Sequence, residues 1–114
     1  MKQDKDTEQK IGKLQLLEQN MQTFTLQRQN LQVQLSEITN ASKELKESKG
    51  NVYKIVGNIM VLADKDNIEK DLESKKDFIE LRIKNLEKQE NKIREEASEL
   101  QKEILKKIKN EKEE

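Results

Sequence analysis

Apolar residues in the first part of the chain recur with the spacing of a coiled coil. With Leu14 at an a position and Leu17 at a d position, eight of the ten a and d positions through residue 45 are apolar. Residues 13–49 contain neither Gly nor Pro. A repeat sustained over about four to five heptads is typical of a coiled-coil helix, so the pattern predicts one long helix over residues 8–48. The a positions are Leu14, Met21, Arg28, Leu35 and Ser42, and the d positions are Leu17, Phe24, Leu31, Ile38 and Leu45.

The same spacing returns in the last part of the chain and predicts a second coiled-coil helix over residues 66–110. All five d positions there are apolar, whereas the a positions include two charged residues. Asp64 or Asp66 is placed to cap the first turn, and lysines near residue 107 suit the last turn, where cations interact favourably with the helix dipole. The d positions are Leu72, Ile79, Leu86, Ile93 and Leu100, and the a positions are Lys76, Ile83, Glu90, Ala97 and Ile104.

Residues 51–63, between the two predicted helices, have the pattern of a β-hairpin. Gly50 ends the first helix, and two β-branched runs then flank Gly57-Asn58. Gly at the first position of a two-residue loop favours a type II′ turn. The alternative is a buried helix through Ile55–Leu62, which the central Gly-Asn pair and the enrichment in Val and Ile disfavour.

Both faces of this hairpin are apolar. Side chains alternate between the faces of a strand, and a two-stranded sheet alone is marginal in water. The helix ends can cover one face at most, so the pattern favours a hairpin that joins a sheet or barrel with other subunits. The simpler alternative, a turn that only connects two helices, leaves these apolar residues unexplained. The residues predicted to mediate oligomerisation are Val52, Tyr53, Ile55, Val56, Ile59, Met60, Val61 and Leu62.

Composition narrows the class of protein and its chemistry. The chain has 114 residues, of which 40% are charged and 32% hydrophobic, with 23 basic and 23 acidic residues. A compact globular core normally needs more apolar residues, and disorder is favoured by a large net charge, so a single mostly helical domain over residues 1–114 is expected. The absence of Cys and His removes thiol nucleophiles, the usual neutral general base and the commonest transition-metal ligands. We therefore expect that the protein is not an enzyme and that it has no catalytic site, no metal site and no cofactor.

Nucleic-acid and membrane binding are also disfavoured. Phosphate binding needs a basic face, but the lysines are interleaved with acidic residues. The longest apolar run, Ile59–Ala63, is too short to span a bilayer, and no basic amphipathic helix with a Trp- and Phe-rich apolar face is present. The first residues lack the apolar stretch of a secretory signal, so a cytoplasmic location is expected.

Apolar residues also gather near both ends of the predicted helical pair. If the helices pack antiparallel, the start of the first lies beside the end of the second. Several of these residues exceed what an a and d interface needs, which indicates either a partner or scattered surface hydrophobic residues. We refer to this cluster as the tip, and it consists of Ile11, Leu14, Leu16, Leu17, Leu100, Ile104, Leu105 and Ile108.

Among the a positions of the first predicted helix, only Arg28 is charged. Polar residues at a positions commonly set helix register at a cost in stability. We hypothesise an ion pair between Arg28 and either Glu87 or Glu90 of the second helix.

The order helix, single hairpin, helix resembles an archaeal-type β-class prefoldin subunit. The run Val52–Val61 is similar to the family's hairpin, with its Y-K-x-x-G core at Tyr53–Gly57. The run Leu72–Leu100 is similar to the family's second helix, including Arg82, Leu86 and the Glu-Lys-Gln-Glu stretch at 87–90. An α-class subunit would carry two hairpins, and only one fits between these helices.

The resemblance implies an antiparallel two-helix coiled coil whose β-hairpin joins an intersubunit β-barrel. It implies a heterohexamer of two α-class and four β-class subunits that captures unfolded polypeptides at the coiled-coil tips without ATP and delivers them to a group II chaperonin. The alternative is a structural coiled-coil scaffold or dimerisation protein without client binding.

Overall fold

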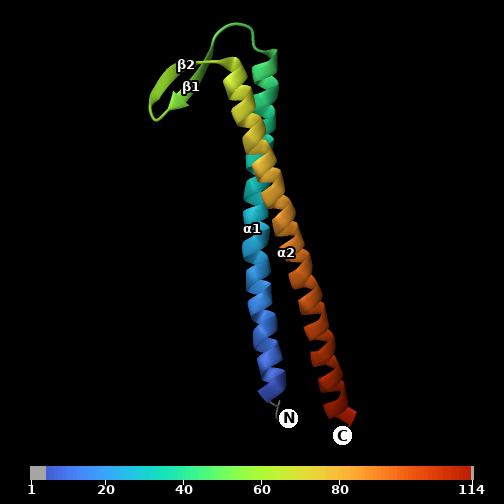
Figure 1. Ribbon diagram of the computed structural model, residues 1–114. Coiled ribbons are helices and arrows are strands. Elements are labelled where there is room, and N and C mark those ends of the chain that lie inside the picture. Colours follow the sequence, from blue (N-terminus) through green and yellow to red (C-terminus); the bar gives the residue numbers. More distant parts are fainter. Residues whose placement is uncertain (1–4, 114) are drawn as a thin grey trace. The chain divides into compact units, whose positions relative to one another are not determined.

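The computed structural model describes residues 5–113, without the side chains of residues 111 and 113. Helix α1 (Lys5–Glu47) is followed by strands β1 (Val52–Val56) and β2 (Ile59–Ala63) and by helix α2 (Lys65–Glu113) (Figure 1). Two long helices with one hairpin between them were predicted, and this fold is confirmed. Helix α1 begins three residues before the expected position 8, and α2 extends three residues past the expected position 110.

The described residues form two compact units, each containing part of both helices. The first unit combines the described part of Met1–Arg28 with that of Asn85–Glu114. Its buried apolar side chains all occupy the predicted a and d positions, which face the other helix. These core residues are Leu17, Leu86, Ile93 and Ile104.

The second unit, Gln29–Lys84, contains the end of α1, the hairpin and the start of α2. Its buried apolar side chains again come from a and d positions and are Leu31, Leu45, Ile79 and Ile83. The helices supply this core, whereas most hairpin side chains are exposed. The core of the second unit therefore lies between the helices, outside the sheet.

Local interactions fix where the helices end and begin around the hairpin. Gly50 has a φ of 104°, a left-handed backbone conformation that glycine adopts without steric penalty, and it follows the end of α1. At the start of α2, the Asp64 carboxylate accepts a hydrogen bond from the backbone N–H of Asp66 over 3.3 Å. The Asp64 carbonyl accepts the first helical bond from Ile68, at 3.1 Å. Asp64, rather than Asp66, is therefore the N-cap.

The hairpin has the predicted two-residue turn. Strands β1 and β2 pair antiparallel, with Val52 opposite Ala63 at one end and Val56 opposite Ile59 at the other. Gly57 and Asn58 are left as the loop. Gly57 has a φ of 61°, and among the described residues no non-glycine residue has a positive φ. A positive φ at the first loop position alone is the signature of a type II′ turn, so the predicted turn type is confirmed.

Within residues 5–113, no helix contains a stretch long and apolar enough to cross a membrane.

Candidate interaction surfaces

The register of the hairpin assigns its apolar residues to two faces. Tyr53 pairs with Leu62 and Ile55 with Met60, so these four residues form one face, which we call the Tyr53 face. The other face carries Val52, Lys54, Val56, Ile59, Val61 and Ala63 and is called the Lys54 face. Lys54 is the only charged residue among the ten strand residues that form the two faces. Only the Tyr53 face is therefore free of charge.

Both faces are open to solvent in the single chain. On the Tyr53 face, Ile55 is 70% exposed and Met60 66%. On the Lys54 face, Ile59 is 67% exposed and Val56 55%. Of the eight residues predicted to mediate oligomerisation, only Val52 is half-buried. An exposed apolar patch on this scale is typical of a protein–protein contact, and the two strands also keep their outer edges unpaired within the described sheet.

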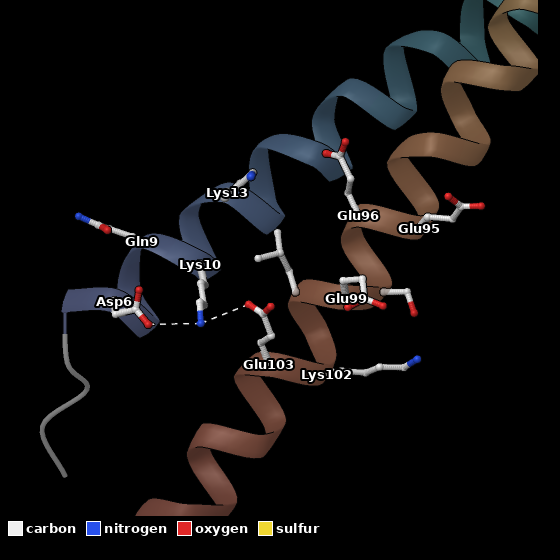
Figure 2. A pocket seen from close by; sticks show the side chains of 11 residues that line it. Asp6, Gln9, Lys10, Lys13, Glu95, Glu96, Glu99, Lys102 and Glu103 are labelled. Atoms are coloured by element: carbon white, nitrogen blue, oxygen red, sulfur yellow. Dashed lines mark ion pairs between the residues drawn. The ribbon is translucent and has the colours of Figure 1, made fainter.

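Ion pairs join the two helices at the tip end of the first unit. The Lys10 ammonium of α1 lies 3.2 Å from a carboxylate oxygen of Asp6 and 3.2 Å from one of Glu103 on α2. Lys107 of α2 lies 3.0 Å from Asp6. Figure 2 shows Lys10 between Asp6 and Glu103, at the edge of a groove between the helices. These contacts establish that the start of α1 lies beside the end of α2, as the antiparallel arrangement requires.

Sequence spacing explains why charged residues close this end of the unit. Lys10 and Lys107 continue the two d series by one heptad beyond Leu17 and Leu100. The apolar interface therefore gives way to an ionic layer in the outermost turns. Asp6, Lys10, Glu103 and Lys107 were not identified from the sequence, although extending the heptad count by one step would have found both lysines.

The ion pairs shift the titration of their members in opposite directions. Hydrogen bonds from Lys107 and then Lys10 lower the pKa of Asp6 below its ordinary 3.8. A hydrogen bond to Glu103, then one to Asp6, raises the pKa of Lys10 above 10.5. The stability that the ionised Asp6 adds to the folded state is therefore fully present above about pH 3.8, and it is lost as the pH falls through the lowered pKa. The stability that the charged Lys10 adds is fully present below about pH 10.5, and it is lost as the pH rises through the raised pKa.

The predicted tip residues differ in how accessible they are. Leu16 and Leu105 are 55% and 66% exposed. Leu17 and Ile104 are buried in the helix interface. The remaining four are half-buried and are Ile11, Leu14, Leu100 and Ile108. Leu16 and Leu105 therefore offer the most apolar surface of this cluster to a partner.

Arg28 forms the ion pair that the sequence suggested. Its guanidinium Nε donates to a Glu90 carboxylate oxygen over 2.6 Å, and the Thr25 hydroxyl donates to the other oxygen over 3.2 Å. Glu90 is only 4% exposed. The hydrogen bond to Glu90 is the main cause of the raised pKa of Arg28, and the charge of Glu87 adds to it. Of the two suggested partners, Glu90 is thus the one in direct contact.

Further exposed apolar residues lie on the outer faces of the helices. Leu26 and Val33 are one heptad apart on α1, and Phe78 and Leu81 are three residues apart on α2. Arg82 lies over the Phe78 ring, 6.0 Å from its centroid. All four residues lie off the a and d positions. Leu26 and Val33 were not singled out from the sequence.

These features define a class of protein: a two-helix coiled coil with an exposed, unpaired apolar hairpin. The sequence pattern of the family described as "Prefoldin subunit" matches residues 8–111. Prefoldin subunit beta of Sulfolobus acidocaldarius is 36% identical over 96 residues, covering 82% of this chain and 77% of that protein. Prefoldin subunit beta of Archaeoglobus fulgidus is 38% identical over 96 residues, covering 82% and 83%. The chain belongs to the prefoldin family.

A solved structure agrees with the sequence comparisons. The crystal structure of the prefoldin beta subunit from Thermococcus strain KS-1 superposes with a TM-score of 0.83 at 31% identity, covering 89% of this chain and 90% of that one. The resemblance to β-class prefoldin subunits is therefore confirmed. The protein is a prefoldin-type chaperone subunit that assembles with other prefoldin subunits, and the family is one of chaperones rather than enzymes.

Proposed function

We propose that this chain is a β-class subunit of a cytoplasmic heterohexamer with two α-class and four β-class subunits. The hairpin residues Val52–Val56 and Ile59–Leu62 join those of neighbouring subunits in a β-barrel. The supporting observation is the exposure of both hairpin faces in a chain whose family assembles. Burying a large apolar side chain contributes about 1.5–3 kcal/mol, so covering several of them outweighs the marginal stability of two isolated strands.

The assembled complex captures unfolded polypeptides at the tip residues without ATP and delivers them to a group II chaperonin. Leu16 and Leu105 supply the exposed apolar surface, and the half-buried tip residues extend it. One tip offers little apolar area, but several tips in one complex bind a long unfolded chain together and raise its effective affinity. Charged side chains, which make up 40% of the chain, keep the helices and this surface solvated.

Paired substitutions of exposed leucines test the client-binding role. Replacing Leu16 and Leu105 with serine removes apolar surface from the tip without opening the helix interface. The matched control, Leu26→Ser with Leu81→Ser, removes leucines that are 61% and 58% exposed outside the tip cluster. We expect the tip variant, in the assembled complex, to suppress aggregation of a diluted denatured protein less than the control does. Equal suppression by both variants contradicts the tip assignment, and absence of suppression by the wild-type complex supports the scaffold alternative.

A further inference from the structure

All four elements of the second unit line an apolar cleft at the base of the hairpin. The cleft has a volume of about 500 Å³. Among its ten lining residues only Glu44 is charged. The apolar side chains come from α1, from the two strands and from α2, and include Ala41, Leu45, Tyr53, Met60, Ile68 and Leu72.

The Tyr53 face of the hairpin opens into this cleft. Tyr53 and Met60 both line it, and both belong to the face that carries no charge. They are 51% and 66% exposed, so the helix ends leave this face uncovered. A side chain that packs against Tyr53 and Met60 from within the cleft also approaches the helix residues that line it. The surface of the hairpin and the surface of the helix bases are continuous.

We propose that the hairpin of a neighbouring prefoldin subunit inserts apolar side chains into this cleft. The subunit interface then extends from the Tyr53 face onto Ala41 and Leu45 of α1 and onto Ile68 and Leu72 of α2. This inference rests on the proposed function, in which hairpins associate between subunits. The occupant is a neighbouring hairpin because the cleft continues the surface at which hairpins meet, whereas the tip residues belong to the other unit.

The side chain at position 41 provides a direct test. Ala41 is small and exposed, so Ala41→Trp fills part of the cleft without replacing a buried residue. Asn40→Trp is the matched control, because Asn40 is exposed on the next position of α1 and does not line the cleft. In complexes formed with the α-class partner, we expect Ala41→Trp to raise the subunit concentration needed for assembly about tenfold, as loss of an interface packing contact does. Assembly of Ala41→Trp equal to that of Asn40→Trp overturns the inference.

The same measurement on a hairpin variant separates this inference from the proposed function. Ile55→Asp with Val61→Asp places a charge on each face of the hairpin. If this variant fails to assemble while Ala41→Trp assembles normally, the hairpin association stands and the cleft inference fails. If both variants assemble normally, the hairpin association itself is wrong.

Photo-cross-linking identifies the occupant even if Ala41→Trp alters folding. Glu44 is exposed and lines the cleft, so benzoylphenylalanine at this position reports on what enters it. In the assembled complex, we expect cross-linked peptides from the hairpin of a neighbouring subunit, found by mass spectrometry. Cross-links confined to the same chain, cross-links to added denatured protein alone, or no cross-link between subunits each overturn the inference.

Discussion

At the scale of single residues, the contact among Arg28, Glu90 and Thr25 places a buried carboxylate inside the helix interface. Glu90 is 4% exposed, and both of its carboxylate oxygens accept hydrogen bonds from α1. Removing one partner of a buried pair leaves the other without compensation, whereas replacing both with apolar residues is often neutral or stabilising. The pair therefore fixes how the two helices align in the first unit, since a shift of one turn would separate its members.

We expect Arg28→Leu to lower the melting temperature by several degrees, because it leaves the Glu90 carboxylate buried with only Thr25 as a donor. The double variant Arg28→Leu with Glu90→Leu should melt at or above the wild-type temperature. Thermal unfolding followed by circular dichroism measures both. If Arg28→Leu alone melts above the wild-type temperature, a buried Glu90 without Arg28 does not destabilise the protein, and this account is contradicted.

At the scale of elements, the hairpin shows what a sequence pattern determines and what it leaves open. Gly57-Asn58 between two β-branched runs was sufficient to predict the strands and the turn type, because these depend on local backbone preferences. The two helices were predictable for a similar reason, since their interface repeats every heptad. The ends of α1 and α2 were less predictable, because the charged outer turns give no apolar periodicity to count.

The interactions that depend on two distant segments were the least accessible to sequence analysis. The Arg28 pair was suggested with two candidate partners, and only the three-dimensional arrangement selects Glu90. The bridge from Lys10 to Asp6 and Glu103 was missed, because the heptad count began at Leu14 and because Glu103 lies on the other helix, far away in the sequence. The cleft at the hairpin base likewise requires four elements in defined positions.

We expect the hairpin to mediate assembly, whereas the helical content comes from α1 and α2 and does not depend on the hairpin. Ile55→Asp with Val61→Asp should therefore abolish the complex with little change in the far-ultraviolet circular dichroism of α1 and α2. Asn58→Asp is the control, because it adds a charge at the exposed turn without altering either apolar face. Native mass spectrometry of complexes formed with the α-class partner distinguishes the variants. A complete complex containing the double variant would refute assembly through the hairpin.

At the scale of the whole molecule, the residues proposed for assembly and for client capture fall in different units. The hairpin belongs to Gln29–Lys84, whereas the tip residues lie in the unit formed from the two ends of the described chain. Residues 1–12 and 105–114 include Ile11, Leu105 and Ile108 together with Lys10 and Lys107 of the ionic layer. No hairpin residue and no residue of the cleft at its base is among them.

Deletion of residues 1–12 and 105–114 should therefore leave assembly intact and weaken client capture. Because several tips hold one unfolded chain, weakening every β-class tip at once should reduce the apparent affinity by about ten- to a hundredfold, more than loss at a single tip would. Aggregation suppression, compared at equal concentrations of assembled complex, measures the effect. Deletion of residues 110–114 alone is the control, since it retains the ion pairs and all eight tip residues. If the longer deletion also prevents assembly, the two functions are not separable in the way their positions indicate; if it assembles and captures clients as well as the control, the clients bind elsewhere.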